Sequence, residues 1–303
     1  MDLVHVKGNT YYLDSMTTLP VYKIDDSRCI LIDSGWSFER SGIQQALKEH
    51  NLQLAAIIGT HAHPDHCGNH EFFREKYRVP IIMSEGEADL LYNHLSIKTQ
   101  MYVFSPEEIL QLDEFCTMPA RSEQIIRRFD RTVNVAGVTF DVLHTPGHTS
   151  DHIALITPDG ICCVGDAVMS EEVLENSKLP YHISVADAME SMELLRQFHL
   201  PAICSHKGWS EDLSKLAEKN IEHCQYRAKV VLQIINERMS MEEAVAKVCK
   251  ELRLLSKKVF KVKIYDREVR NFMDYLLDQG KIRQSAGEGR IFCEPVHVHH
   301  QKK

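Results

Sequence analysis

Short apolar runs alternate with amphipathic stretches over about the first 210 residues of the chain. Short apolar runs bounded by turn residues predict strands, and apolar positions spaced three or four apart predict helices. The strands predicted in this way are residues 21–24, 29–33, 54–59, 79–84, 138–145, 152–157, 161–166 and 201–206. The predicted helices are residues 39–50, 69–77, 85–95 and 185–199. This mixed order predicts a layered α/β fold.

Residues 96–132 interrupt this alternation. They carry Tyr102, Phe104, Phe115 and Met118 among charged residues. We interpret the segment as an insertion that packs over one end of the fold as a lid. A peripheral excursion with no role in a site is the alternative.

The pattern becomes helical from about residue 221. An apolar stripe marks each of three segments, residues 224–238, 241–252 and 266–279. Two short extended pieces around a glycine-rich turn follow in residues 280–294, and three helices followed by a hairpin is the order of a winged helix. We therefore predict a catalytic α/β domain over residues 1–215 and a small helical, winged-helix-like domain over residues 216–303.

The composition is that of a globular, core-forming protein, since 44% of the 303 residues are hydrophobic and 26% are charged. No apolar run reaches the length of about 18 residues that a membrane span requires. The N-terminal segment does not resemble a signal peptide. Nine cysteines are scattered without a disulfide framework, which favours reduced thiols. We therefore expect a cytoplasmic protein without a membrane segment.

The net charge of −8 is unevenly distributed. Residues 1–210 hold 16 Lys and Arg against 29 Asp and Glu, a balance of −13, whereas residues 211–303 hold 19 against 14, a balance of +5. The first region is not expected to attract polyanions, and the second could do so. Because a balance of +5 is modest, a solvated helical face is the preferred interpretation.

The densest polar cluster follows a predicted buried strand. Residues 60–70, THAHPDHCGNH, hold four histidines in eleven positions. His61 and His63 lie two positions apart, so in an extended chain their side chains leave on the same side. With Asp65 and His66 they offer three imidazoles and one carboxylate from six consecutive positions. This set suits a cation such as zinc.

Three later segments place further candidate ligands at or just past the ends of predicted strands. They are His148 in HTPGHTSDH, Asp166 in GDAV and His206 in SHKG. Loops that leave the same edge of a sheet can converge on one site. A chance collection of polar loop residues is the alternative.

The order H-x-H-x-D-H, TPGHT, GD and a late histidine resembles the metallo-β-lactamase superfamily over roughly residues 5–210. The resemblance implies a four-layered αβ/βα sandwich with the site at one edge. It assigns the first metal to His61, His63 and His148. It assigns the second metal to Asp65, His66 and His206. It places Asp166 as a bridge between the two metals.

Two divalent ions about 3.5–4 Å apart can share one water and lower its pKa toward about 7. We expect the resulting bridging hydroxide to attack the substrate directly. Asp65 or a metal-bound water would steer the proton to the leaving group, so Asp65 and Asp166 are the candidate catalytic residues. Two zinc ions are the expected cofactor, and iron and manganese accept the same ligands.

Two further histidines are candidates for the substrate pocket. His152 opens a predicted strand close to the expected site, where it would contact substrate or hold a metal ligand through a hydrogen bond. His182, in PYHIS, would line the pocket. For both residues a satisfied core histidine is the alternative.

Two groups of the superfamily resemble the chain most. HTPGHTSDHIAL, GDAV and the winged-helix-like tail resemble the lactamase-β-like 2 proteins, which act as endoribonucleases, although SHKG stands where that group usually has P-G-H-G. The thioesterases, of the glyoxalase II type and of a quinolone-pathway type with an insertion and a helical C-terminus, form the second group. The acidic first domain and the aromatic insertion favour a small organic substrate.

We therefore predict a dinuclear-metal-dependent hydrolase of a small ester or thioester. Endoribonuclease-type cleavage of a phosphodiester is the first alternative. The others are a metal-stabilised regulator without catalytic activity and a dioxygenase that uses one iron. A complete ligand set argues against the regulator, because a structural metal site closes its coordination. The expected partner is a small-molecule substrate; nucleic acid is not favoured, and a homodimer is allowed.

Overall fold

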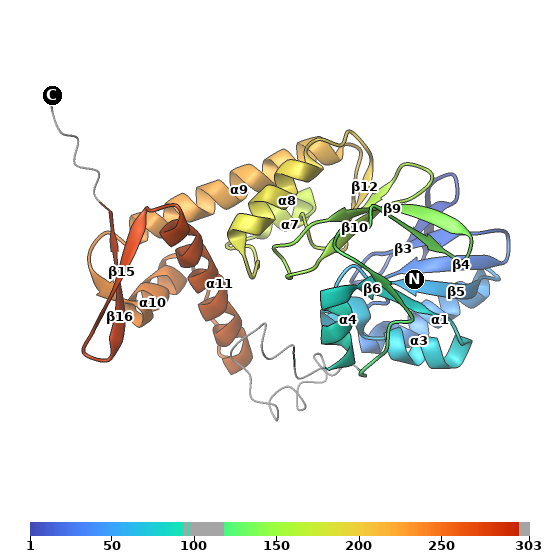
Figure 1. Cartoon of the computed structure of the whole chain (residues 1–303), viewed down its shortest axis with the longest axis horizontal. Coiled ribbons are helices and arrows are strands. Elements are labelled where there is room, and N and C mark those ends of the chain that lie inside the picture. The colour runs from blue at the N-terminus through green and yellow to red at the C-terminus, as the bar shows by residue number, and fades with distance from the viewer. Residues whose placement is uncertain (94–95, 97–117, 297–303) are drawn as a thin grey trace.

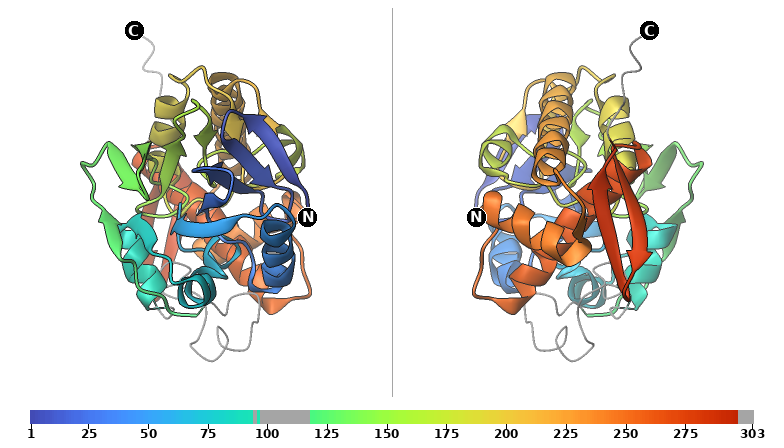
Figure 2. Two further views of the ribbon diagram at one scale, coloured as in Figure 1. Left: turned by 90° about the vertical axis from the view of Figure 1, so that its right-hand side faces the viewer. Right: turned by 90° about the vertical axis from the view of Figure 1, so that its left-hand side faces the viewer.

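The computed structural model describes residues 1–93, 96 and 118–296 of the chain. Within these ranges, a pair of sheets lies face to face, and helices cover their outer faces (Figure 1; Figure 2). The core between the sheets takes Ile30 and Ile58 from the first sheet and Phe140 and Leu155 from the second. This helix–sheet–sheet–helix order is the predicted four-layered α/β sandwich, and the fold class is confirmed.

Seven strands of the described chain form the first sheet, in the order β1 to β7. They are β1 (Leu3–Lys7), β2 (Thr10–Leu13), β3 (Leu19–Lys23), β4 (Arg28–Ile32), β5 (Gln53–Ile58), β6 (Ile81–Ser84) and β7 (Gln124–Ile126). β1 to β4 are antiparallel neighbours, whereas β4 to β7 run parallel. β4 and β5 therefore end at one edge of the sheet, and the segments that follow them lie together there.

Six strands among the described residues form the second sheet, in the order β13-β12-β11-β10-β9-β8. They are β8 (Thr132–Val135), β9 (Val138–His144), β10 (Ile153–Ile156), β11 (Cys162–Cys163), β12 (Ala202–Ile203) and β13 (Trp209–Ser210). β11 and β12 run parallel, and the other neighbours are antiparallel. The adjacent cysteines of β11 face different cores. Cys162 packs toward the outer helices, and Cys163 packs toward the first sheet.

The outer helices bury the apolar stripes that the sequence predicts. α1 (Arg40–Glu49) and α3 (His70–Tyr77) pack on the first sheet, and α1 buries Ile43, Ala46 and Leu47 there. α4 (Glu85–Tyr92) lies beyond β6. α8 (Val185–Leu195) covers the second sheet together with the beginning of α9 (Leu213–Ile234). Short helices α2 (Pro64–Cys67), α7 (Glu171–Asn176) and the 3-10 turn η1 (Ser37–Glu39) lie in connecting segments.

The C-terminal region has its own apolar core at one end of the long axis of the molecule (Figure 1). After α9 it contains β14 (Met239–Ser240), α10 (Met241–Glu251), α11 (Val259–Asp278), β15 (Ile282–Gly287) and β16 (Arg290–Pro295). A capping box starts α10, because Ser240 Oγ accepts from the Glu243 N–H while the Glu243 carboxylate accepts from the Ser240 N–H. The strand order is β14-β16-β15. The winged-helix assignment of this region stays a prediction.

α9 is longer than the sequence pattern suggested. We expected a helix from residue 224 and a domain boundary at residues 215 and 216, but α9 begins at Leu213 and runs through that boundary. The Asp212 carboxylate caps the helix by accepting from the Ser214 N–H at 3.0 Å. Its first half buries residues such as Leu216 against α8, and its second half buries residues such as Val231 in the C-terminal core. One helix therefore contributes to both cores.

The predicted insertion over residues 96–132 lies largely outside the described residues. Its last segment contains β7, which pairs in parallel with β6 and extends the first sheet. That segment belongs to the sheet and is not a lid. A strand of three residues is too short to show an alternation of polar and apolar side chains, so the sequence did not reveal β7.

Within the described ranges, no helix combines the length and apolar character that crossing a membrane requires. The eight cysteines in the same ranges are free thiols, and seven of them are buried. Burial raises the pKa of these thiols, for example that of Cys29 to about 12. The buried thiols are therefore protonated and unreactive at neutral pH.

Candidate metal centre

Three imidazoles converge at the edge of the sandwich. His61 and His63 lie in the segment after β5, and His148 lies after β9. The Nε2 of His61 is 3.1 Å from the Nδ1 of His63, and the Nε2 of His148 is 2.9 Å from the same Nδ1. Sequence segments more than eighty residues apart thus supply one cluster of nitrogen atoms.

Hydrogen bonds decide which nitrogen of two of these rings faces the cluster. The hydroxyl of Thr60 donates to Asp33 at 2.8 Å, so we assign it as the acceptor of the His61 Nδ1–H at 3.0 Å. The Nδ1–H of His148 donates to the Tyr181 carbonyl oxygen at 3.0 Å. Both rings therefore present an Nε2 lone pair to the cluster, which is the form in which histidine binds a metal.

Burial lowers the pKa of each of these histidines. The pKa of His63 falls to about 3, because burial and the neighbouring His148 both disfavour its charged form. Burial and the adjacent imidazoles hold the pKa of His61 well below its usual range. Burial also lowers the pKa of His148. The first cluster is therefore neutral at pH 7 and its lone pairs are available.

A second cluster adjoins the first and contains two carboxylates and two imidazoles. Asp65, His66, Asp166 and His206 each place one ligand atom within 4.8 Å of the others. The Nε2 of His206 lies 3.3 Å from Asp65 Oδ2 and 3.4 Å from Asp166 Oδ2. The Nε2 of His66 lies 3.4 Å from Asp166 Oδ1.

Asp166 lies between the two clusters. Its Oδ2 is 3.4 Å from the Nε2 of His148 in the first cluster and 3.4 Å from the Nε2 of His206 in the second. A carboxylate in this position can contact two cations at once. The structure thus brings together all seven residues that the sequence suggested as metal ligands.

The second cluster is charged, in contrast to the neutral first cluster. Asp166 raises the pKa of His206 to about 10 despite partial burial. Burial disfavours the charge on His66, but Asp166, Asp65 and Asp33 outweigh it and raise the pKa of His66 well above its usual range. The two imidazolium ions in turn hold the pKa of Asp166 well below its usual range against the opposing effect of burial. Without a cation, protons on the two histidines neutralise the carboxylates.

Asp33 orients one histidine of each cluster through hydrogen bonds. It follows β4, is 1% exposed and accepts three hydrogen bonds. The donors are the Thr60 N–H at 2.7 Å, the Thr60 hydroxyl at 2.8 Å and the His66 Nδ1–H at 2.7 Å. Through Thr60 it orients His61, and directly it orients His66, so the Nε2 of each ring points into its cluster.

His152 positions Asp166 and does not line the pocket. We expected it either to contact substrate or to hold a metal ligand through a hydrogen bond, and the second role is the one observed, because its ring is fully buried and both nitrogens are engaged. Its Nδ1 bonds to the Thr145 hydroxyl at 2.8 Å, and its Nε2 accepts from the Asp166 N–H at 3.1 Å. Gly165 makes this approach possible, because it has a φ of +53° and an added Cβ would lie 2.5 Å from the His152 Nε2.

Glu87 anchors the segment that carries the first two histidines. This buried residue of α4 accepts from the N–H of Ala62, between His61 and His63, at 2.8 Å. It also accepts from the Asp151 N–H at 3.3 Å, which ties the two loops together. Burial raises the pKa of the Glu87 carboxyl to about 7.

A small pocket opens beside the clusters. It has a volume of about 170 Å³ and is lined by the ligands His148, Asp166 and His206 and by largely apolar walls. Its other lining residues are Val168, Met169, Val173, Pro180, Tyr181 and His182. His182 is therefore where the sequence placed it, and burial lowers its pKa to about 3, so its ring is neutral.

Sequence reasoning missed Asp33 and Glu87. The signal for Asp33 was present, since an aspartate directly after an apolar strand at the carboxyl edge of a parallel sheet is a typical site residue. Glu87 carried no such signal, because it lies in an amphipathic helix among other acidic residues. Only the fold brings it under Ala62.

The donor sets fit divalent cations on chemical grounds. Nitrogen lone pairs that face one another at 2.9–3.1 Å repel unless a proton or a cation lies between them. The second set of two imidazoles and two carboxylates is one that zinc, iron or manganese accepts. The residues present could therefore hold one cation in each cluster, with Asp166 contacting both.

We expect metal binding to release protons from the second cluster only. At about pH 6.5 a metal-bound water would keep its proton, because its usual pKa lies higher. At this pH His66 and His206 are protonated and the first cluster is neutral. A cation must therefore displace protons from the second cluster alone. Calorimetric titration with Zn²⁺ in buffers of different ionisation enthalpy measures this release. His206→Ala should lower it by about one proton. Unchanged release in that variant would contradict the assignment.

Residues 16–218 match the sequence model of the metallo-beta-lactamase superfamily. A probable metallo-hydrolase from Bacillus subtilis is 28% identical over 169 residues, which are 56% of this chain and 67% of that protein. The hydroxyacylglutathione hydrolase of Pectobacterium carotovorum is 30% identical over 146 residues, 48% of this chain and 44% of that protein. The chain thus spans less than half the length of this second relative.

Solved structures share the fold over nearly the whole chain. A metallo-beta-lactamase family protein from Thermus thermophilus superposes with a TM-score of 0.71 at 20% identity and covers 94% of this chain and 98% of its own. A beta-lactamase domain protein from Burkholderia ambifaria gives a TM-score of 0.72 at 19% identity, with coverages of 97% and 94%. Because the matched sequence includes every segment that supplies the two clusters, the chain belongs to the metallo-beta-lactamase superfamily.

Proposed function

We propose that the protein is a dinuclear-metal-dependent hydrolase that cleaves a small ester or thioester, with two zinc ions as its cofactor. The observation that carries this proposal is the position of Asp166 between a cluster of three imidazoles and a cluster of mixed donors. Two adjacent cation sites are what hydrolysis by a shared water requires.

Bound cations would lower the pKa of water and polarise the carbonyl group of the substrate. The chain itself contributes the rest of the site. Asp65 and Asp166 would offset part of the positive charge of the cations. Asp33, Glu87 and His152 position the ligand-bearing segments through hydrogen bonds. The Asp65 side chain is 16% exposed and lies beside the pocket, so we propose that it accepts a proton and passes it to the leaving group.

The size and character of the pocket favour a small acyl group. A volume of about 170 Å³ holds only a few non-hydrogen atoms, and Val168, Met169 and Pro180 offer an apolar surface. The hydroxyacylglutathione hydrolases among the relatives are named for cleavage of an acylated thiol. A thioester is therefore the first substrate class to test.

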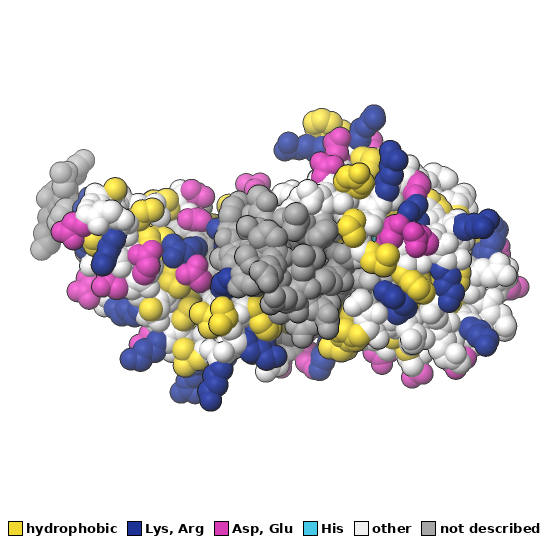
Figure 3. Space-filling view, turned by 90° about the horizontal axis from the view of Figure 1, so that it is seen from below, with side chains coloured by type: hydrophobic (Ala, Val, Ile, Leu, Met, Phe, Trp, Pro, Cys, Tyr) yellow, Lys and Arg dark blue, Asp and Glu magenta, His cyan; other side chains and the backbone are white. Residues whose placement is uncertain are grey.

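Nucleic acid remains the less favoured substrate. On the face seen in Figure 3, Lys and Arg side chains of the C-terminal region are interspersed with Asp and Glu and do not form a continuous stripe. Binding to a polyanion relies on such clustered basic charge. For the compartment we propose the cytoplasm, because the described cysteines are free thiols.

A substrate panel tests the proposal. Zinc-loaded protein is assayed with short acyl thioesters, aryl esters, a bis-aryl phosphodiester and single-stranded RNA. We expect turnover of thioesters or esters that is lost after chelation and restored by Zn²⁺. RNA cleavage without ester or thioester turnover would make the nuclease alternative correct. Turnover of none of these substrates by fully loaded protein would favour the regulator.

A further inference from the structure

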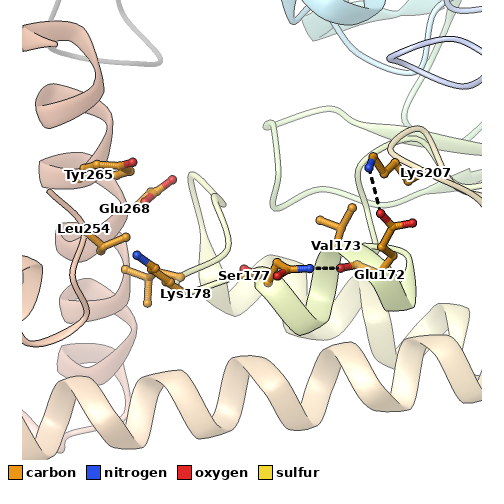
Figure 4. A pocket seen from close by; sticks show the side chains of 10 residues that line it. Glu172, Val173, Ser177, Lys178, Lys207, Leu254, Tyr265 and Glu268 are labelled. Carbon is orange, nitrogen blue, oxygen red and sulfur yellow. Dashed lines mark hydrogen bonds and ion pairs between the residues drawn. The ribbon is translucent and has the colours of Figure 1, made fainter. Parts of the chain in front are cut away.

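A cleft of about 510 Å³ lies between the catalytic body and the C-terminal region (Figure 4). One wall is α7 and the segment after it, including Val173 and Lys178, and the other is formed by Tyr265 and Glu268 of α11 together with Leu254. Val173 lines both this cleft and the pocket at the metal-ligand clusters. Lys207, the neighbour of the ligand His206, also lines the cleft. The cleft therefore adjoins the proposed active site, with Val173 as a shared wall.

Glu268 differs from the other charged residues that line this cleft. Glu172 and Lys207 pair with each other at 2.9 Å, and the Lys178 ammonium donates to the Arg253 carbonyl oxygen at 2.8 Å. Glu268 is only 8% exposed, yet it makes no hydrogen bond or ion pair with any residue in the described ranges. Figure 4 shows its carboxyl group projecting from α11 into the cleft.

The carboxyl oxygens of Glu268 are not fully enclosed, so their unused hydrogen-bonding capacity is accessible from the cleft. Burial raises the pKa of Glu268 to about 8, so its carboxyl group is mostly neutral at pH 7, and a positive charge beside it would favour the ionised form. Lys178 and Lys207 are held by other acceptors and do not supply this charge. A partner that enters the cleft from outside would do so.

We propose that Glu268 forms a subsite for a cationic nitrogen, an ammonium or amidinium group carried by the part of the substrate remote from the scissile bond. The proposal rests on the proposed hydrolase function for the identity of that molecule as a substrate. The acyl group occupies the small pocket, and the rest of the substrate extends past Val173 along the cleft. Glu268 is then a specificity-determining residue that does not take part in bond cleavage.

The test compares ω-aminoalkyl thioesters of increasing chain length with their N-acetylated, uncharged counterparts. We expect the best amine to exceed its acetylated partner about tenfold to a hundredfold in kcat/KM, through a lower KM, because an ion-paired hydrogen bond contributes that much. Glu268→Gln should remove this preference and leave turnover of the acetylated substrates unchanged. Glu251→Gln, which removes the same charge from an exposed position of α10, should keep the preference.

A binding measurement separates the subsite from the catalytic function. The corresponding thioethers cannot be hydrolysed, and their affinities for wild type, Glu268→Gln and Glu251→Gln are measured by calorimetry. If the amines bind more tightly than the acetylated compounds and this difference disappears in Glu268→Gln, the subsite is supported. This holds even if no thioester is turned over, because the absence of turnover would overturn only the hydrolase proposal. The subsite is wrong if amines and acetylated thioethers bind wild type equally, if no amine binds, or if Glu268→Gln keeps the preference while melting at the wild-type temperature. If that variant fails to fold, Glu268→Asp takes its place and should retain a weakened preference.

Discussion

Asp166→Ala is expected to lose metal and turnover together, with hydrolysis reduced by at least about 10³-fold. The reason is its position, since one side chain lies 3.4 Å from an imidazole of each cluster. Its removal takes a ligand from both proposed sites and leaves His66 and His206 without their main counterion. Metal analysis after dialysis and a thioester assay on the same sample measure both effects.

Asp141→Ala provides a matched control for this variant. Asp141 is exposed on β9 and belongs to neither cluster, and its replacement by alanine removes the same charge. We expect this control to keep full metal content and rate. Full occupancy of both sites and a normal rate in Asp166→Ala would show that Asp166 is not a ligand.

The second large effect is expected for Asp33→Ala, which should destabilise the metal-free protein by about 3–5 kcal/mol. Alanine leaves three buried donors without an acceptor, the two of Thr60 and the Nδ1–H of His66. Metal affinity should also fall about 10–100-fold, because His61 and His66 lose their fixed orientation. Urea denaturation measures the first effect and competition with a chromogenic chelator the second.

Asp33→Asn separates hydrogen bonding from charge at the same position. The amide oxygen can still accept from the Thr60 N–H, but its NH₂ group would face both the Thr60 hydroxyl and the His66 N–H, so we expect an intermediate loss of stability. Equal stability of wild type and Asp33→Ala would mean that the three hydrogen bonds contribute nothing net. A normal metal affinity in Asp33→Ala would show that the ligands are oriented by packing alone.

The sequence was sufficient to name the seven candidate ligands that the structure brings together, because their residue types are those of metal sites. His61, His63, Asp65 and His66 lie within six positions, and the later ligands end predicted strands. The role of Asp33 depends on something no local pattern contains, the parallel pairing of β4 with β5 that places it beside Thr60. The position of Asp33 after an apolar strand marks it as a candidate site residue, but its hydrogen-bond partners follow only from this long-range pairing.

The role of His152 and the start of α9 became clear in the folded structure. For His152 the sequence left two roles open, contact with substrate or a hydrogen bond that holds a metal ligand, and the structure shows the second, since its Nε2 accepts from the Asp166 N–H. The start of α9 was placed too late, although its buried positions Leu213, Ala217, Ile221, Cys224, Ala228 and Val231 follow one helical spacing from end to end.

The continuity of α9 has a consequence for how proteins of this architecture can diverge. Because an α-helix advances by 3.6 residues per turn, one residue inserted between Cys224 and Ala228 would rotate everything that follows by about 100° and move it by about 1.5 Å. α11 would swing away from α7, and Glu268 would no longer face Val173. Insertions in this stretch should therefore be selected against, or occur in multiples that restore the phase of the helix, whereas the hairpin turn at Glu288 and Gly289 can vary in length without disturbing the cleft.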